Sequence, residues 1–211
     1  DTLVVCLQDV RVWSEQNPRH TPIWISFNLK DQAIPGLPDP ELFTPEALNL
    51  LDEQLRGALT TQLIQPADVQ GLNWPTLAEA RGKVLLILDE GGAKRDWYYN
   101  NWQTRPMFTN APEGHPAAGV MIINDPIEDF ARIQRLVKAG YLVRTRADAG
   151  TLEARSNDTL RRDRAFASGA QAISTDYYRA ATHFGNDYRV AIDGGVRCNP
   201  VLLPQPCVVA E

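Results

Sequence analysis

Arg144, Arg146 and Asp148 are charged residues whose types and spacing could bind an anion. They occupy alternate positions at the end of the segment 140–148, which begins with the apolar run Tyr-Leu-Val after a glycine. Since successive side chains of a strand point to opposite faces, an extended backbone would direct all three to one side. Two fixed cations beside a carboxylate predict a binding site for an anionic group. A salt-bridged strand end is the alternative that this segment leaves open.

Five apolar segments would position these and other polar residues. They cover residues 22–29, 84–89, 118–123, 141–146 and 171–175, with helical or loop segments between them. Such alternation is typical of parallel βαβ units. Each segment ends in polar or charged residues, and parallel α/β sheets bind ligands at the carboxyl ends of their strands. The sequence therefore predicts an α/β fold with its site along that edge.

Apolar spacing and capping residues predict helices around the strands. Apolar residues recur at helical spacing over residues 2–16, where Cys6 is expected to be a buried small hydrophobe rather than a nucleophile. Thr44 and Pro45 predict the start of a second helix. Thr76, three residues before a glutamate, predicts a capping box.

The remaining connections have less regular patterns. Asp125 is expected to cap a helix that runs to Gly140, and residues 151–167 are expected to form one charged amphipathic helix. Residues 60–74 are expected to be irregular. Residues 91–116 are expected to form a long aromatic-rich insertion, for which two interpretations remain open: a functional loop or a small packed flap.

Composition and charge exclude several function classes. The 211 residues have a formal net charge of −5 and a sequence pI of about 5.3. We therefore expect one domain without the broad basic surface of a nucleic-acid-binding protein. No apolar run approaches the roughly 18 residues of a membrane span. The chain begins at Asp1 rather than at a methionine, from which we expect a processed product or a fragment.

Cys198 and Cys207 bracket a proline-rich segment near the C-terminus. They predict a disulfide, which would stabilise the fold by roughly 2.5–3 kcal/mol through loop-closure entropy. Disulfides persist in oxidising compartments, so a secreted or extracytoplasmic protein is expected. A zinc site is not expected, because two thiols without clustered histidines do not complete four ligands.

Several further motifs accompany the charged segment. The motifs are Arg144-Thr-Arg-Ala-Asp148, Glu153-Ala-Arg155, Ala167-Ser-Gly-Ala-Gln171, Ser174-Thr-Asp-Tyr177, Arg197-Cys-Asn-Pro200 with Cys207, Arg81-Gly-Lys-Val84, Asn124-Asp-Pro126, His20-Thr-Pro-Ile23 and Lys30-Asp31. Together they resemble the calcium-dependent phosphoinositide-specific phospholipase C family of bacteria and fungi. The resemblance covers nearly the whole chain, and its specificity lies in the combination rather than in one motif.

This resemblance implies the phosphodiesterase version of the TIM barrel. A full barrel has eight strands and typically about 250 residues, whereas five strands are visible in this sequence. We therefore expect residues 1–211 to be the C-terminal part of a single barrel that lacks its first strands. The family carries its two catalytic histidines and most of its acidic calcium ligands in that N-terminal part, so this chain is expected to be inactive by itself.

The resemblance also implies an activity, the cleavage of phosphatidylinositol to diacylglycerol and an inositol phosphate. The inositol 2-hydroxyl would attack the phosphodiester and form a cyclic ester, while calcium and cationic side chains stabilise the charged transition state. Lys30, Arg144 and Arg146 would hold the phosphate or the inositol hydroxyls. The implied partners are a phosphoinositide and the membrane surface that presents it.

Four further residues take a role in substrate binding by the same resemblance. Asp89, Asp148 and Asp176 would orient the cations, and Tyr177 would stack on the inositol ring. For Asp176, a cap on the turn after the strand is the alternative.

Asn28 is a departure from the family pattern. The family has an acidic residue two positions before the lysine, whereas this chain has Asn28 two positions before Lys30. A carboxamide oxygen can ligate Ca²⁺ but contributes no charge, so a weakened calcium site is expected. A hydrogen-bonded polar group at the mouth of the barrel is the alternative for Asn28.

The three histidines of the chain are not expected to be catalytic. His20 precedes a strand, at the end of the barrel away from the chemistry, and is expected to be structural. His115 and His183 lie in loop segments without a positioned partner that would make either of them a general base.

Two other functions remain open. A glycerophosphodiester phosphodiesterase uses the same barrel, but water rather than a substrate hydroxyl attacks the phosphorus. A non-catalytic barrel that binds an anion or a lipid headgroup is the second alternative.

Overall fold

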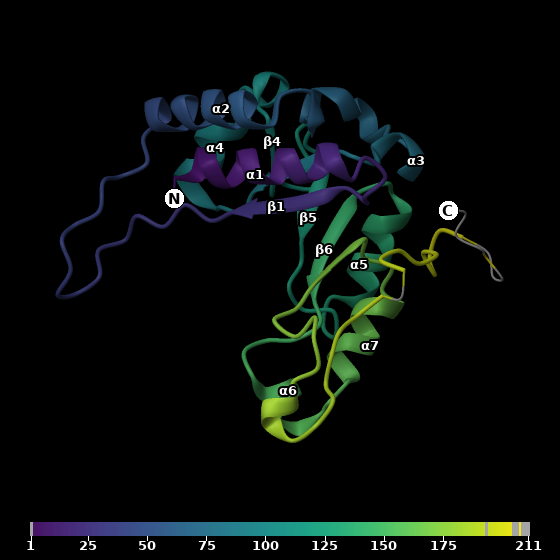
Figure 1. Ribbon diagram of the computed structural model, residues 1–211. Helices are drawn as coiled ribbons and strands as arrows, with labels where there is room; N and C mark the ends of the chain where they lie inside the picture. The colour runs from purple at the N-terminus through teal and green to yellow at the C-terminus, as the bar shows by residue number, and fades with distance from the viewer. Residues whose placement is uncertain (1, 193, 204–206, 208–211) are drawn as a thin grey trace. The chain divides into compact units, whose positions relative to one another are not determined.

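The computed structural model of the chain describes residues 2–192, 194–203 and 207. The chain divides into two compact units, Asp1–Gly119 and Val120–Glu211. Helices alternate with strands along the chain, and every strand pair that the described residues form is parallel (Figure 1). The predicted α/β class is therefore confirmed.

The sheet of the first unit is built around β3. Its strands are β1 (Ile23–Phe27), β2 (Leu63–Ile64), β3 (Val84–Leu88) and β4 (Met107–Thr109). β3 pairs with β1 along its full length, and with β2 near its start and β4 near its end. All five residues of β3 are buried, as a continuous apolar run predicts.

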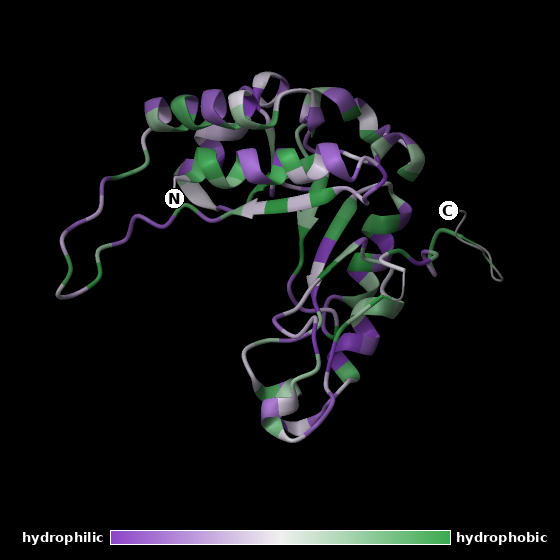
Figure 2. Ribbon diagram, in the orientation of Figure 1, coloured by the Kyte–Doolittle hydropathy of each residue, from purple (hydrophilic) through white to green (hydrophobic). Residues whose placement is uncertain are grey.

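Helices accompany this sheet, and α1 (Leu3–Gln16) and α2 (Pro45–Leu59) contribute leucines to its core. The first unit also has α3 (Leu77–Ala80) and α4 (Gly92–Tyr99), with the 3₁₀ helices η1 (Thr60–Gln62), η2 (Pro66–Leu72) and η3 (Trp102–Thr104). The predicted caps are confirmed, since Thr44 accepts a bond from the amide of Ala47 and Thr76 forms its capping box. Figure 2 shows hydrophobic and hydrophilic positions alternating along α1 and α2, and the buried leucines of α2 join the core around β3.

Two expectations for the first unit were wrong, that for residues 60–74 and that for Cys6. Residues 60–74 contain β2. Residues 91–116 contain α4 and β4, whose Tyr98 and Phe108 are buried, as a packed segment requires. A proline lies within two residues of each of these strands, Pro66 after β2 and Pro106 before β4, and proline is a turn signal, which is why the sequence did not reveal β2 and β4. Cys6 is exposed, because α1 buries a narrow face that includes Leu7 and Ser14.

The second unit has a three-stranded sheet with the order β5-β6-β7. The strands are β5 (Val120–Ile122), β6 (Leu142–Arg146) and β7 (Ala172–Ser174), and the helices are α5 (Phe130–Lys138), α6 (Leu152–Ser156), α7 (Leu160–Ala167) and η4 (Thr182–Phe184). In the register of β6 and β7, Arg146 lies beside Ser174. The three predicted strands of this unit are thus confirmed.

Two helices of this unit differ from expectation. α5 begins at Phe130, whereas Asp125 caps the preceding turn by accepting bonds from the amides of Ile127 and Glu128, at 2.9 and 3.2 Å. Residues 151–167 form two helices, because Asn157 adopts a left-handed conformation (φ 53°) that ends α6.

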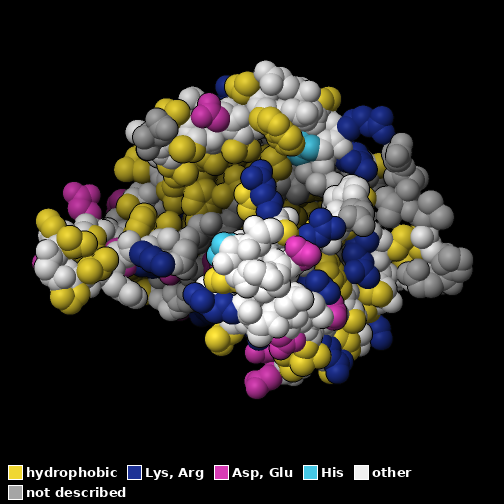
Figure 3. Space-filling view, turned by 60° about the horizontal axis from the view of Figure 1, so that its bottom comes forward, with side chains coloured by type: hydrophobic (Ala, Val, Ile, Leu, Met, Phe, Trp, Pro, Cys, Tyr) yellow, Lys and Arg dark blue, Asp and Glu magenta, His cyan; other side chains and the backbone are white. Residues whose placement is uncertain are grey.

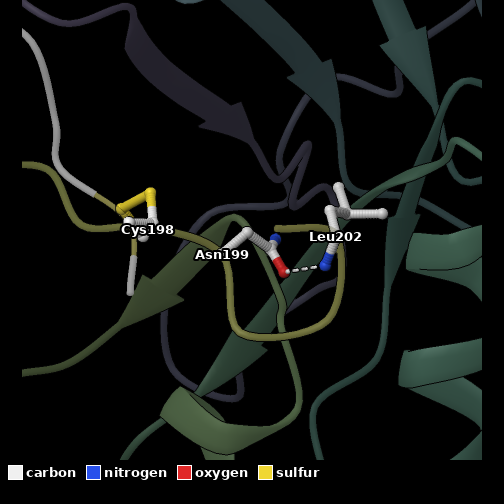
Figure 4. Close-up of a disulfide and its surroundings, with 4 residues drawn as sticks. Cys198, Asn199 and Leu202 are labelled. Atoms are coloured by element: carbon white, nitrogen blue, oxygen red, sulfur yellow. Dashed lines mark hydrogen bonds between the residues drawn. A yellow bond between two sulfur atoms is a disulfide. The ribbon is translucent and has the colours of Figure 1, made fainter. Parts of the chain in front are cut away.

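The disulfide between Cys198 and Cys207 is confirmed (Figure 4). Next to it, Oδ1 of Asn199 accepts bonds from the amides of Val201 and Leu202, at 2.9 and 3.3 Å. The Asn199 amide donates to the carbonyl of Gly169, 2.8 Å away, so this loop is held against the turn that follows α7. Within the described part of the chain, no helix is both long and apolar enough to cross a membrane.

Candidate functional site

A cavity of about 210 Å³ lies at the carboxyl ends of β6 and β7. Its lining residues are Arg144, Arg146, Asp148, Ala149, Gly150, Ser174, Thr175 and Asp176. Because the two strands are parallel and adjacent, the polar residues that follow each of them meet at one edge of the sheet. Four of the seven residues expected to bind substrate therefore lie together in one pocket of the second unit.

The two arginines of the pocket have different surroundings. Arg144 is half-buried and donates a bond of 2.5 Å from Nη1 to Oδ1 of Asn124, which follows β5. Arg146 is exposed, and its guanidinium makes no hydrogen bond or ion pair with any residue that the structure describes. Arg146 is therefore the cation that can bind an anionic ligand without first breaking a bond to a described neighbour.

Asp148 is bonded to the segment that follows β7. Its buried carboxylate accepts a hydrogen bond from the hydroxyl of Thr175, and a second one, of 3.0 Å, from the amide of Asp176. No ion pair joins it to an arginine among the described residues. These two bonds fix the end of β7, and the role of Asp148 in orienting the cations stays a prediction.

The pocket also contains neutral polar groups and a carboxylate that forms no ion pair with a described residue. Asp176 is exposed and forms no ion pair with Arg146, although both line the pocket. The turn after β7 is capped by Thr175, whose hydroxyl accepts a 2.8 Å bond from the amide of Tyr177. The carboxylate of Asp176 can therefore accept hydrogen bonds from the hydroxyls of a ligand, while Arg146 binds an anionic group.

Tyr177 does not line this pocket. Its ring is buried in the core cluster of the second unit and packs edge-on against Tyr188, with ring centroids 5.6 Å apart. Burial, together with the nearby charges of Asp148 and Glu153, raises the pKa of Tyr188 far above its ordinary value. The structure thus places Tyr177 in the apolar support of the site rather than in the position expected for a stacking residue.

Three other expected residues lie in the first unit, and none of them lines the pocket of the second unit. Asn28, which follows β1, donates a 2.9 Å bond from its amide to the backbone carbonyl of Asp89. Lys30 is exposed, two residues after Asn28. Asn28 and Asp89 thus form a separate polar group at the carboxyl ends of β1 and β3, and Lys30 follows two positions later in the chain.

Lys94 is a cation beside this group that the sequence did not reveal. Its ammonium lies 2.5 Å from Oδ1 of Asp31 and also donates to the carbonyl of Leu29. The bond from Lys94, together with one from the amide of Phe43, holds the pKa of Asp31 below its ordinary value. Lys94 comes from α4, in the stretch that was expected to be an insertion, and therefore had no strand end to indicate it.

The residues that the structure describes do not provide a complete set of calcium ligands. Ca²⁺ takes six to eight oxygen ligands, several of them carboxylates. Among the described residues, no three His, Cys, Asp or Glu side chains gather as a metal site. Near Asn28, the carboxylate of Asp31 is bonded to Lys94, and that of Glu90 accepts a bond from the amide of Leu29. Asn28 itself offers one neutral side-chain oxygen, because its amide nitrogen donates to the carbonyl of Asp89.

The three histidines have local roles. The ring of His20 lies 2.7 Å from the hydroxyl of Ser14 and 2.6 Å from the carbonyl of Thr21. His115 accepts a bond of 3.1 Å from the amide of Ala117, and the ring of His183 lies against that of Phe184. None of the three histidines lines the pocket.

Comparison with known proteins places these features in a family. Residues 1–200 match the family described as phosphoinositide phospholipase C, Ca²⁺-dependent. The fold is similar to that of a calcium-dependent phosphoinositol-specific phospholipase C from Pseudomonas sp, at 19% identity and a TM-score of 0.51. That alignment covers 69% of this chain and 59% of the Pseudomonas chain.

A second similar structure is that of a Ca²⁺-dependent phosphatidylinositol-specific phospholipase C from Streptomyces antibioticus. It is 17% identical, with a TM-score of 0.59, and the alignment covers 84% of this chain and 71% of the Streptomyces chain. At these identities the likeness shows the fold. No curated protein matches the sequence.

Proposed function

The chain belongs to the family of calcium-dependent phosphoinositide phospholipases C, and on this premise we propose that its pocket binds the inositol phosphate headgroup of phosphatidylinositol. The observation that supports the proposal is that Arg146 and Asp176 line the same pocket and form no ion pair with each other. A phosphate requires a cation, and the hydroxyls of inositol require acceptors. The pocket offers both, on the ends of two adjacent strands.

The proposed reaction is the cleavage of phosphatidylinositol. The 2-hydroxyl oxygen of inositol forms a bond to phosphorus, the bond from phosphorus to the diacylglycerol oxygen breaks, and a cyclic inositol phosphate results. Arg146 would stabilise the charge that develops on the non-bridging phosphate oxygens. A base must take the proton of the 2-hydroxyl, and an acid must protonate the diacylglycerol oxygen. The proposal assigns both transfers to residues other than those that line the pocket.

The shorter length of the chain is part of this proposal. The chain aligns with 59% of the Pseudomonas protein. We propose that residues 1–211 form the C-terminal part of one TIM barrel, and that catalytic histidines on a further segment complete the reaction. Lys30, Asn28 and Asp89 follow the carboxyl ends of strands of the first unit, the end at which parallel α/β sheets bind ligands, and we propose that they contribute to substrate or calcium binding there.

The family is described as calcium-dependent. Calcium would supply charge stabilisation at the phosphate. Since the described residues do not complete its shell, no step of the proposed reaction depends on calcium bound by this chain. Asn28 would contribute one neutral oxygen to a shell whose charged ligands lie elsewhere.

The substrate and the disulfide together suggest where the protein acts. Phosphatidylinositol is a bilayer lipid, so the protein would work at a membrane surface. The disulfide between Cys198 and Cys207 fits an oxidising compartment, and we propose that the protein is secreted.

A ligand series tests the proposed function. Calorimetric titration with myo-inositol 1-phosphate, glycerol 3-phosphate and inorganic phosphate compares ligands that share the phosphate and differ in the hydroxyls. We expect the inositol ester to bind at least about tenfold more tightly than the other two, because its ring carries more hydroxyls that can donate to Asp176. Equal affinities for the three ligands would overturn the headgroup assignment. Tighter binding of the glycerol ester would favour a glycerophosphodiesterase.

A product analysis tests the reaction separately. Phosphatidylinositol vesicles are incubated with residues 1–211 alone and with a protein extended by the proposed further segment, with calcium or with a chelator. The soluble products are followed by proton and phosphorus NMR, and the lipids by thin-layer chromatography. A cyclic inositol phosphate formed by the extended protein supports the proposed reaction. Release of inositol together with phosphatidic acid would contradict it, because a different phosphodiester bond would have been cut.

A further inference from the structure

The loop at residues 31–44 is the longest connection in the first unit without a helix or a strand. It joins the carboxyl end of β1 to the start of α2, and Figure 1 shows it extending away from the helices and the sheet of that unit. Three prolines within it, Pro35, Pro38 and Pro40, restrict its backbone. The loop is therefore a stiffened protrusion rather than a segment packed on the core.

A tight turn forms part of this loop. The amide of Leu37 donates a 3.0 Å bond to the carbonyl of Ile34, with Pro35 and Gly36 between them. Gly36 has a φ of 86°, the positive value that a type II turn requires of its third residue. A Cβ added to Gly36 would meet no atom within 4 Å, so the turn stands in open space.

The side chains of the loop are unusually apolar for such a position. Ile34 is 59% exposed, Leu37 61% and Leu42 70%. Ile34 and Leu37 are the first and last residues of the turn, so their Cα atoms lie within about 7 Å of each other. Hydrophobic side chains gather at the end of the protrusion (Figure 3), and hydrophobic and hydrophilic stretches alternate along it (Figure 2). A solitary exposed leucine is ordinary, whereas several on one protruding loop indicate an interaction surface.

The base of the loop is fixed. Oδ2 of Asp31 accepts a 3.0 Å bond from the amide of Phe43, and Oδ1 of Asp31 is paired with Lys94 at 2.5 Å. Thr44 caps α2 directly after the loop. The two ends are thus held together, and insertion of the apolar side chains would not require the rest of the unit to rearrange.

The shape of the loop favours a lipid bilayer as its partner. A stable protein interface needs about 800 Å² on each side, in matched shapes, which three side chains on a convex loop do not provide. A fluid bilayer accepts a convex apolar protrusion without such complementarity. Residues 31–44 contain Asp31, Asp39 and Glu41 and no Lys or Arg, so attraction to anionic headgroups does not drive the contact.

We propose that the 31–44 loop inserts Ile34, Leu37 and Leu42 into the interfacial region of a lipid bilayer and thereby holds the protein at the surface. The proposal rests on the proposed function in one respect, because an enzyme whose substrate is a bilayer lipid must bind to the bilayer surface. The contact itself is hydrophobic, so it does not require the inositol headgroup and does not depend on salt.

The test is co-sedimentation with vesicles of pure phosphatidylcholine, which carry no inositol. The loop variant combines Ile34→Ala, Leu37→Ala and Leu42→Ala. The control variant combines Leu50→Ala, Leu152→Ala and Leu160→Ala, which truncate side chains that are 59%, 75% and 55% exposed on helices. Both variants lose three exposed aliphatic side chains, so the two variants differ only in where on the protein these side chains are lost.

The loop variant is expected to partition to these vesicles at least about tenfold less than the unaltered protein. The control variant should stay within about twofold of it, at low and at high salt. An equal loss in the two variants, no loss in the loop variant, or no partitioning of the unaltered protein would each overturn the proposal.

A second measurement separates this proposal from the headgroup assignment. The loop variant should bind myo-inositol 1-phosphate as the unaltered protein does, because no loop residue lines the pocket. Arg146→Ala should weaken that binding and leave partitioning to phosphatidylcholine unchanged. A protein that partitions through the loop but does not bind the inositol ester would retain the loop assignment and lose the headgroup assignment.

Discussion

The hydroxyl of Thr175 donates a hydrogen bond to the buried carboxylate of Asp148, and this bond joins the ends of two adjacent strands. The second oxygen of Asp148 accepts the amide of Asp176, 3.0 Å away. Thr175 also caps the turn into Tyr177. The carboxylate of Asp148 thus holds the segment after β7 that contains Asp176, whereas Arg146 lies on the adjacent strand β6.

Replacement of Asp148 is expected to destabilise the protein. In Asp148→Ala, the hydroxyl of Thr175 and the amide of Asp176 lose a charged acceptor in a buried place. The free energy of unfolding should fall by about 3 kcal/mol, because each of the two bonds involves an ionised group. Urea denaturation measures the loss. Asp187→Ala, which removes an exposed carboxylate of the same unit, should stay within about 0.5 kcal/mol, and similar losses in the two variants would contradict this account.

Tyr98 and Asp52 form a buried hydrogen bond in the first unit. The hydroxyl of Tyr98 lies 2.6 Å from Oδ1 of Asp52, while Arg105 lies 2.9 Å from Oδ2. Tyr98→Phe should lower the free energy of unfolding at pH 7 by about 1.5 kcal/mol, because one oxygen of a buried carboxylate loses its donor. Tyr99→Phe removes a hydroxyl from the neighbouring position of the same helix and should have little effect.

The same variant has a defined pH dependence. Burial raises the pKa of Asp52 above its ordinary value of 3.8, and the bonds from Tyr98 and Arg105 oppose the increase. Loss of the Tyr98 hydroxyl should therefore raise this pKa further. A raised carboxyl pKa reduces stability as pH rises from 3.8 through the folded-state pKa. The deficit of Tyr98→Phe should accordingly shrink as pH is lowered toward 4, and a deficit that grows instead would refute the assignment.

Gly169 is required both by its backbone conformation and by its neighbour. It has a φ of 80°, and a Cβ added there would lie 2.6 Å from Cγ2 of Val201. Gly185 has a similar φ of 76° with no atom within 4 Å of an added Cβ, and it is the matched control.

Gly185→Ala should therefore lower the free energy of unfolding by about 1 kcal/mol through backbone strain. Gly169→Ala should lower it by about 2–3 kcal/mol, because the clash with the disulfide-linked loop adds to the same strain. Thermal unfolding compares the two variants. Combining Gly169→Ala with Val201→Ala should recover part of the difference, and equal losses in the two single variants would show that the clash is relieved without cost.

The sequence predicted the pocket best where a simple period applies. Arg144, Arg146 and Asp148 alternate along one strand, and all three line the pocket. The role of Asp148 was not predictable, because its partner Thr175 comes from another strand and no period within one segment gives the register between two strands. Tyr177 follows Asp176 directly in the chain, and it is buried whereas Asp176 is exposed. Adjacent residues at a strand end thus face different surroundings, so the motif alone did not show which of them lines the pocket.

The fold was predictable in its class and in its longer elements. β3 was evident from a continuous apolar run, and α2 from its cap and its leucines. β2 and β4 have two and three residues, and their place in the sheet depends on pairing with β3, which local sequence does not encode. Lys94 was missed for the same reason, because its partner Asp31 lies 63 positions away in the chain.

The measurement that tests the central claim most directly is the affinity for myo-inositol 1-phosphate of the unaltered protein, Arg146→Ala and Arg164→Ala. Arg164 is an exposed arginine on α7 that stacks on Phe130, so its variant removes the same charge outside the pocket. We predict at least about tenfold weaker binding for Arg146→Ala and a change of less than about twofold for Arg164→Ala. Equal affinity of all three proteins, or no binding by the unaltered protein, would contradict the assignment of the pocket.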